Sequence, residues 1–310
     1  MTARMETPRC PKCPKGRACP TCGRGAFELW SAQRATVRSL SEFVAFVKPL
    51  APDSGEPVSG QYWYRGQTND GWSLETSFRR MTRHLAKPNS GALLLEEAAR
   101  LEFMSKAHLF IAPGNMAKVK TLPCWWALMQ HHGAPTRLLD WSASPYVAAY
   151  FATQQDGSTQ DGAVWCFCHR RLEAAFVREY GEEPPEPVRT EDEDPRVKRL
   201  HTALRNAKAK ASVVPLKFTF HSSARMAEQQ GRFTMCLRVD QDHTIIATKI
   251  PPTHATKILI PHEAKPDFLA ELRRMNITAA ALFPGVDGLG RSIAELTSLG
   301  ARHAATARKA

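Results

Sequence analysis

Four cysteines near the N-terminus have the spacing of a metal site. Cys10 and Cys13 form one C-x-x-C pair, and Cys19 and Cys22 form a second pair five residues later. Four thiolates satisfy the tetrahedral coordination of zinc, and each C-x-x-C turn directs backbone amides at the sulfurs. The first histidine of the chain is His84, so the thiols would be the complete ligand set. We expect one structural zinc, with a metal-free, thiol-rich tail as the alternative.

A lone arginine follows an aromatic run. In the segment from Gln61 to Gly66, QYWYRG, Arg65 stands on a predicted strand whose neighbours are Tyr and Trp. Burying a guanidinium without an anionic partner is costly. Arg65 therefore either pairs with a protein carboxylate such as Asp140 or grips a phosphate or carboxylate of a ligand in bidentate fashion.

Hydroxyl groups cluster where a second predicted strand enters a helix. A strand over 136–141 is followed by Ser142, Ser144 and Pro145. Ser144 suits the N-cap position, and Pro145 suits the first helical position because its missing N–H is no loss there. Hydroxyls and free backbone N–H groups on one side suit a phosphate or a ribose. The simpler interpretation is a well-capped helix without a ligand.

The elements that position these residues indicate an α+β fold, with a mixed or antiparallel sheet core and flanking helices. Leu94 and Leu101 recur at helical spacing and predict a helix over 93–110 with these residues in the core and Glu96 and Arg100 on the other side. Further strands are expected at 163–168, 213–220, 233–239, 244–250 and 256–260. Further helices are expected at 39–49, 123–132, 196–210, 264–275 and 292–299.

Length, charge and cysteine content limit the class of protein. The chain has 310 residues and a net charge of +12, which favours anionic partners such as nucleotides or nucleic acid. No segment resembles a signal peptide or is apolar for long enough to span a membrane. We therefore expect a soluble, cytoplasmic protein without a membrane partner. Eight cysteines in such a protein indicate metal ligands or free thiols.

Several ordered motifs resemble the FRG domain family, which is named after an (F/Y)-R-G motif. They are Tyr64-Arg65-Gly66, the run from His132 to Ser142, Arg225 with Gln230-Gly231, and Leu282-Phe283-Pro284. The resemblance implies an FRG domain over 40–297. It leaves a cysteine-rich, zinc-knuckle-like segment over 1–30 and a basic tail over 298–310.

The order of the motifs also resembles the R–S–E layout of NAD-dependent ADP-ribosyltransferases. That resemblance implies an ADP-ribosyltransferase-like fold in which NAD is a substrate and a nucleic acid or a protein is the acceptor. Arg65 would hold an NAD phosphate or ribose, Ser142 and Ser144 would shape the nicotinamide pocket, and Tyr146 or Tyr150 would stack on the ligand. These residues would line one cleft with the catalytic turn, Glu228-Gln229-Gln230.

The sequence departs from that layout in the turn. The family places a glutamate where this chain has Gln230, and an amide cannot stabilise positive charge on the ribose as a carboxylate does. Either Glu228 supplies the carboxylate of a transferase or NAD glycohydrolase, or the domain is a non-catalytic module that binds nucleotide or nucleic acid. A hydrolase using Ser142, Asp140 and a histidine is disfavoured, because no G-x-S-x-G elbow is present.

Overall fold

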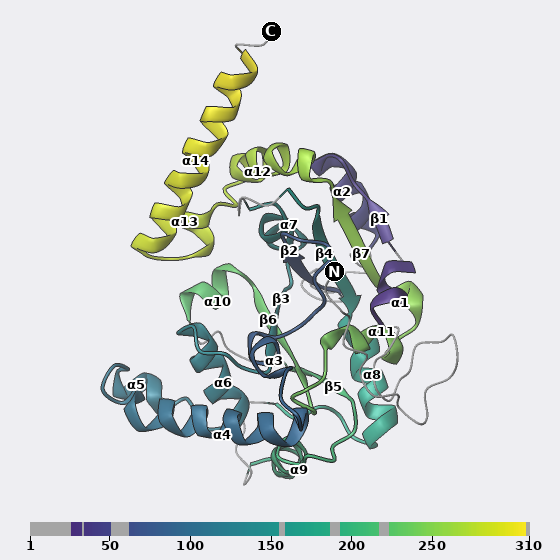
Figure 1. Ribbon diagram of the computed structural model, residues 1–310, viewed down its shortest axis with the longest axis vertical. Helices are drawn as coiled ribbons and strands as arrows, with labels where there is room; N and C mark the ends of the chain where they lie inside the picture. The colour runs from purple at the N-terminus through teal and green to yellow at the C-terminus, as the bar shows by residue number, and fades with distance from the viewer. Residues whose placement is uncertain are drawn as a thin grey trace.

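A seven-stranded sheet forms the centre of the protein (Figure 1). The computed structural model describes residues 26–32, 34–50, 62–154, 159–186, 193–216 and 223–307. The strand order is β1-β7-β4-β2-β3-β6-β5, with β1 parallel to β7 and every other pair antiparallel. The expected α+β fold with a mixed sheet is confirmed. The strands are β1 (Arg34–Thr36), β2 (Tyr62–Gln67), β3 (Leu138–Ser142), β4 (Gly162–Cys168), β5 (Val213–Leu216), β6 (Gly231–Cys236) and β7 (Ala255–Ile260).

Helices cover both faces of the sheet. One face carries α2 (Leu40–Val47), α7 (Pro145–Thr153) and α12 (Lys265–Arg274) over the half that contains β2, and α6 (Leu122–His131) and α9 (Pro195–Leu204) over the half that contains β3. The opposite face packs against α1 (Ala26–Ala32) and α11 (Ile246–Lys249). The remaining α-helices are α3 (Ser77–Thr82), α4 (Pro88–Ala107), α5 (Pro113–Met116), α8 (His169–Tyr180), α10 (Ala224–Glu228), α13 (Ala279–Leu282) and α14 (Val286–Ala307).

The sheet consists of two halves with a narrow junction. β2 pairs with β4 over all six of its residues but is in register with β3 only at Tyr64–Ser142. Beyond that pair, β2 and β3 diverge. Because side chains alternate along a strand, Tyr64 and Ser142 share a face, and the Arg65 side chain starts on the other. The divergence opens a gap between the two halves at Arg65.

The glycine of the Tyr64-Arg65-Gly66 motif lets α7 pack closely on β2. A Cβ added at Gly66 would lie 1.9 Å from the carbonyl oxygen of Ala148 and 2.6 Å from the amide nitrogen of Ala152. No side chain fits at that distance from a helix backbone. Small alanines on α7 complete this contact, and Ser144 caps α7 by accepting the Val147 amide, as the sequence predicted.

The helix predicted over 93–110 begins earlier, as α4, and its orientation is the reverse of our expectation. Leu94 and Leu101 are 75% and 53% exposed, whereas Glu96 and Arg100 are buried. The reason is an ion pair: both Nε and Nη2 of Arg137 donate to the Glu96 carboxylate. Arg137 also donates to the Leu237 carbonyl oxygen at 3.0 Å. This charged pair holds α4 against the sheet together with the apolar contacts of Ala92, Ala99 and Phe103, whereas Leu94 and Leu101 take no part.

The strand predicted over 244–250 is wrong, because this run folds as a short 3-10 helix followed by α11. Asp242 caps the first turn by accepting the Thr244 amide at 2.7 Å. A short apolar run fits a buried helix as well as a buried strand. The basic helix α9 forms the ion pairs Arg196–Asp194 and Arg199–Glu182.

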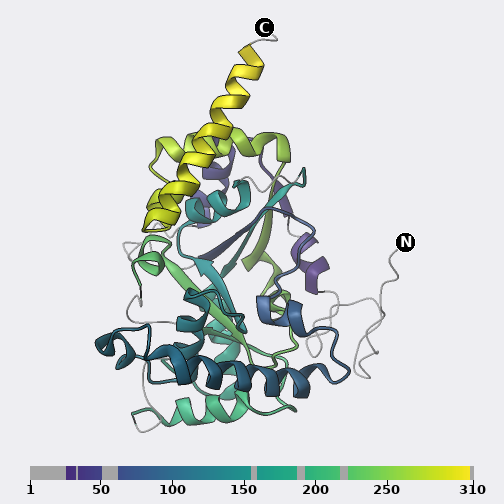
Figure 2. The same cartoon turned by 60° about the vertical axis from the view of Figure 1, so that its left-hand side comes forward.

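The last helix, α14, continues from Val286 to Ala307 and extends away from the body of the protein (Figures 1 and 2). It is longer than the helix predicted over 292–299. Among the described residues, no helix is both long and apolar enough to cross a membrane. The cysteines of the predicted zinc site, Cys10 to Cys22, lie outside the described residues.

Candidate functional site

A pocket of about 170 Å³ lies where β2 and β3 diverge. Its walls come from β3, the end of α6 and the start of α3, and Arg65 enters it from β2. Ligand pockets usually measure ~300–1,000 Å³, so this one has room for a part of a ligand, such as a phosphate or a ribose. The other lining residues are Glu75, Thr76, Ser77, Arg80, Gln130, Gly133, Ala134, Leu138, Leu139 and Asp140.

The Arg65 guanidinium is held by the main chain of β3. Its Nη1 donates to the Asp140 carbonyl oxygen at 2.8 Å, and the Asp140 carboxylate oxygen Oδ2 is 3.9 Å from the same nitrogen. Nε of Arg65 is buried and has no hydrogen-bond partner among the described residues. An unsatisfied buried donor costs ~1–3 kcal/mol. Arg65 is therefore oriented by the protein, and part of its side chain remains exposed in the gap.

Asp140 supplies a carboxylate to the pocket. The side-chain amide of Gln130 donates to its Oδ1 at 2.6 Å. Desolvation by the neighbouring protein raises the pKa of Asp140 against the opposing effects of Arg65, Gln130 and Arg225. The side chain is nevertheless 60% exposed, so water limits the size of this shift. The carboxylate thus reduces the positive charge of the site, and does so less as the pH falls.

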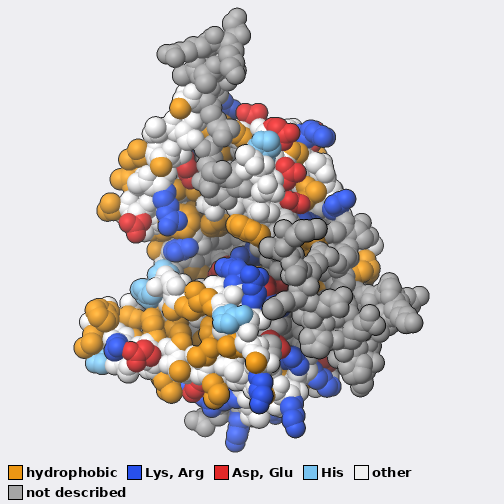
Figure 3. All heavy atoms as spheres, viewed as in Figure 1, with side chains coloured by type: hydrophobic (Ala, Val, Ile, Leu, Met, Phe, Trp, Pro, Cys, Tyr) orange, Lys and Arg blue, Asp and Glu red, His pale blue; other side chains and the backbone are white. Residues whose placement is uncertain are grey.

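Basic side chains gather around a hollow near the centre of the face shown in Figure 3. Arg225 on α10 acts electrostatically on both Asp140 and His131. Burial, His132 and Arg225 together lower the pKa of His131, which keeps that imidazole neutral near pH 7. The permanent cations of the site are therefore arginines.

The structure brings the predicted serines next to the predicted turn. The Ser142 hydroxyl donates to the Gln229 carbonyl oxygen at 2.8 Å and accepts the Ser144 amide at 2.9 Å. The Ala143 amide donates to the Gln230 carbonyl oxygen at 3.0 Å. Both hydrogen bonds of Ser142 are thus made within the protein, which argues against a role for it as a hydrolytic nucleophile.

Within the turn, Gln230 has a backbone φ of 48°, an uncommon conformation for a residue other than glycine. Glu228 and Gln230 are exposed, so their side chains are accessible to a ligand. The pocket that contains Arg65 is lined by none of Ser142, Ser144, Glu228 and Gln230, so it does not form the common cleft predicted for these residues. The turn borders the end of β3, whereas the pocket follows its beginning and middle.

The two predicted stacking tyrosines differ in accessibility. Tyr146 is half-buried and packs against the core beneath α7. Tyr150 is 1% exposed, and its hydroxyl donates to Glu295 on α14. Tyr150 therefore connects α7 to α14, and Tyr146 is the more accessible of the two.

Sequence analysis missed several residues of the pocket. Gln130 positions Asp140 and also accepts a hydrogen bond from Thr136. Arg80 and Thr76 come from the segment around α3. Gln130 could have been identified as the polar residue at the end of an otherwise apolar helix. Arg80 could not, because its place depends on how the loop after β2 returns to the sheet.

A buried polar chain lies on the Arg65 side of the sheet. The Trp141 indole N–H donates to Thr234 Oγ1 at 2.8 Å, and the same hydroxyl is 2.7 Å from His243 Nδ1. Burial lowers the pKa of His243 to about 3, and Arg65 contributes to this shift. The imidazole is therefore neutral, and the chain supports the sheet beneath Arg65 without adding charge.

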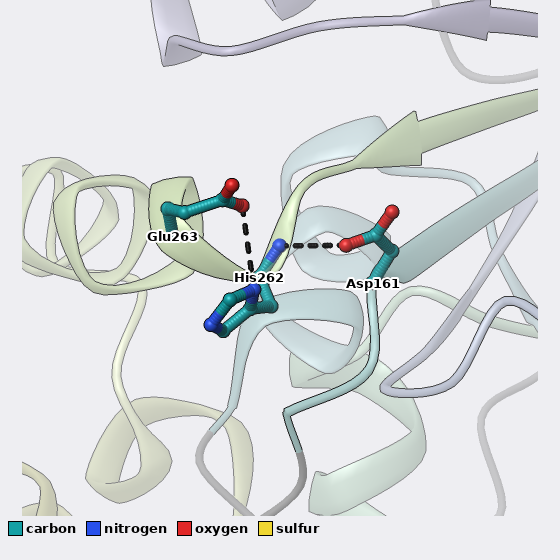
Figure 4. Close-up of side chains that lie close together, drawn as sticks. All are labelled: Asp161, His262 and Glu263. Carbon is teal, nitrogen blue, oxygen red and sulfur yellow. Dashed lines mark hydrogen bonds and ion pairs between the residues drawn. The ribbon is translucent and has the colours of Figure 1, made fainter.

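Asp161, His262 and Glu263 lie close together on the surface (Figure 4). The Asp161 carboxylate accepts the His262 backbone N–H at 2.9 Å, and His262 Nδ1 lies 3.3 Å from the Glu263 carboxylate. These contacts join the β4 entry to the start of α12. His262 and Glu263 are exposed, so we interpret the group as a structural contact that holds the two loops together.

The fold and site together define an α+β protein with an arginine-containing gap in a divided sheet. Residues 60–161, about a third of the chain, match the family model of the FRG domain. The match includes the Tyr64-Arg65-Gly66 motif and the strand that ends at Ser142, and it supports the resemblance drawn from these residues. Neither the curated proteins nor the solved structures contain a match to the chain.

Proposed function

We propose that the FRG domain binds NAD or a related nucleotide at the gap between β2 and β3 and transfers its ADP-ribose to an acceptor or to water, with release of nicotinamide. The observation that carries the proposal is Arg65, which is fixed to β3 and lines an open pocket with a side chain that is 22% exposed. A guanidinium in that state suits a phosphate, because it offers planar, charged hydrogen-bond donors. The adjacency of Ser142 to the turn at Gln230 adds support.

In this proposal each of three residues has a separate role. Arg65 binds a phosphate and fixes the nucleotide relative to β3. Glu228 supplies the carboxylate that stabilises the positively charged ribose as the bond to nicotinamide breaks. Gln230 donates a hydrogen bond to the ribose.

Three substitutions test these roles through NAD affinity and nicotinamide release. Arg65→Lys keeps the charge but loses the planar fork, so NAD should bind more weakly by about 1.5–3 kcal/mol. Glu228→Gln should preserve affinity and slow turnover by about two orders of magnitude, because only the transition state carries the charge. Gln230→Glu should raise turnover.

Arg178→Lys, on the exposed side of α8, is the matched control. Wild-type protein that binds no NAD at millimolar concentration would refute the proposal.

One observation favours a second function, a non-catalytic nucleotide-binding module. An amide, Gln230, stands where the transferase layout has a carboxylate, and the Ser142 hydroxyl already donates its proton to the Gln229 carbonyl oxygen. This alternative predicts NAD binding that depends on Arg65, with no nicotinamide release by the wild type or by the Gln230→Glu variant.

We further propose one structural zinc bound by Cys10, Cys13, Cys19 and Cys22. Zinc binds deprotonated thiols that are held close together, so metal binding is coupled to the folding of this segment. Elemental analysis of purified protein should give about one zinc per chain, and the fourfold Cys→Ser variant should give none. A zinc content below about half an equivalent, unchanged in the variant, would contradict the proposal. Cys124 and Cys166 are buried free thiols, so Cys124→Ser serves as the control.

A further inference from the structure

Two arginines on different helices share one aromatic ring at the edge of the site. The guanidinium carbons of Arg225, on α10, and Arg291, on α14, each lie 4.7 Å from the centre of the Phe283 ring. The two cations are therefore no more than twice that distance apart. Phe283 is 8% exposed and packs edge-on against Phe151. The ring is thus a fixed platform for two exposed cations.

Neither arginine has a carboxylate partner within 4 Å among the residues that the structure describes. Glu228 follows Arg225 by three residues, and Glu295 follows Arg291 by four, so both are at the spacing of helical ion pairs. Glu295 instead accepts a hydrogen bond from Tyr150. Partial burial lowers the pKa of Arg225, Asp140 opposes this shift, and Arg291 adds to it through repulsion between the two cations. An anion between them would relieve that repulsion.

The arginine pair is rigidly connected to the turn that carries Gln230. The side-chain amide of Gln229 donates to the Leu282 carbonyl oxygen at 3.0 Å, which fastens the end of α10 to α13. Arg225 and Arg291 are absent from the lining of the Arg65 pocket. A ligand bound by the pair therefore lies beside the turn and outside the pocket.

We infer that Arg225, Phe283 and Arg291 form a clamp for the phosphodiester backbone of a single-stranded nucleic acid, which is the acceptor in the proposed function. Both cations are exposed, as a polyanion crossing the edge of the site requires. Arginine binds phosphate oxygens through its planar fork while stacking on an aromatic ring. The net charge of +12 favours such a partner. The acceptor role rests on the proposed function, whereas phosphodiester binding does not.

The test is fluorescence anisotropy with labelled oligothymidylate and oligouridylate of about 12 nucleotides, within the range of known single-strand sites. The variants are Arg225→Gln/Arg291→Gln and Arg225→Lys/Arg291→Lys. The control is Arg178→Gln/Lys208→Gln, which removes the same charge from exposed positions on α8 and the loop after α9. Thermal unfolding of each variant confirms that it is folded, and NAD affinity is measured in parallel.

The Gln pair should weaken oligonucleotide binding about tenfold or more and reduce the slope of log K against log salt by about 1.4, since each phosphate contact contributes about 0.7. The oligonucleotide affinity of the Lys pair should lie between those of the wild type and the Gln pair, because lysine keeps the charge but loses the stacking of the guanidinium. The control should change less than about threefold, because exposed charges that contact no ligand contribute little to binding.

Three results would overturn the inference: no oligonucleotide binding by the wild type, an equal loss in the control, or a loss of NAD affinity with oligonucleotide binding unchanged. The last would assign the pair to the dinucleotide itself. Failure of the proposed function gives a different result, namely that wild-type protein binds the oligonucleotide through the pair and binds no NAD.

Discussion

Asp140 and Arg65 set the charge of the candidate site at the scale of single residues. The two side chains approach to 3.9 Å, yet the short hydrogen bond of Arg65 goes to the Asp140 main chain. The orientation of Arg65 therefore does not depend on the carboxylate. The carboxylate instead competes with an incoming anion for the same guanidinium.

Asp140→Asn should tighten the binding of an anionic nucleotide by about threefold to tenfold, the effect expected of one partly screened charge. In the wild type, affinity should rise as the pH falls through the raised pKa of Asp140, since protonation removes the negative charge. That pH dependence should disappear in the variant. Calorimetric titration with NAD across pH measures both effects, with Glu102→Gln on α4 as the control. Weaker binding by Asp140→Asn would show that the carboxylate contacts the ligand directly.

At the scale of elements, the contact between α7 and β2 determines where the gap opens. Gly66 brings β2 against the backbone of α7, and Ser142 leads from β3 into the same helix. Both strands are thus fixed to one helix at the narrow junction. Their divergence beyond Tyr64–Ser142 follows from that arrangement.

Gly66→Ala should destabilise the protein by about 3 kcal/mol or more, at the upper end of the range for overpacking, because its Cβ would meet backbone atoms that cannot move separately. Gly114→Ala is the control, since a Cβ there meets nothing within 4 Å. Urea unfolding of both variants and the wild type measures the change in the free energy of unfolding. Equal stability of the two would show that α7 can shift away from β2.

The elements themselves were largely predictable from sequence, and their orientations were not. Local signals such as Ser144-Pro145 located the start of α7, because caps act over one turn. The buried face of α4 depended instead on Arg137, 41 residues beyond Glu96. Likewise, the sequence indicated Arg65 as a site residue but not the carbonyl group that orients it. Pairings between distant residues leave no local pattern.

For the molecule as a whole, His243 links folding to pH. Its pKa is about 3 in the folded protein and ~6.5 when unfolded, so the unfolded chain binds an extra proton between these values. Folding stability is therefore full above about pH 6.5 and decreases as the pH falls, by up to about 1.4 kcal/mol per pH unit.

His243→Asn should remove this contribution, so the decline in unfolding free energy between about pH 6 and 4 should be shallower than in the wild type. The amide can still reach Thr234. Chemical unfolding at several pH values provides the measurement, and the exposed His84 supplies the control as His84→Asn. An unchanged slope would mean that other groups dominate the acid sensitivity.

The pairing of β1 with β7 has a consequence for how the chain folds during synthesis. Arg34 is in register with Lys257, so β1 leaves the ribosome long before its partner strand exists. Contacts this distant in sequence form slowly, and the exposed strand edges of incomplete sheets promote aggregation. We therefore expect nascent chains that lack β7 to depend on chaperones, with β1 joining the sheet only after translation has passed Ile260.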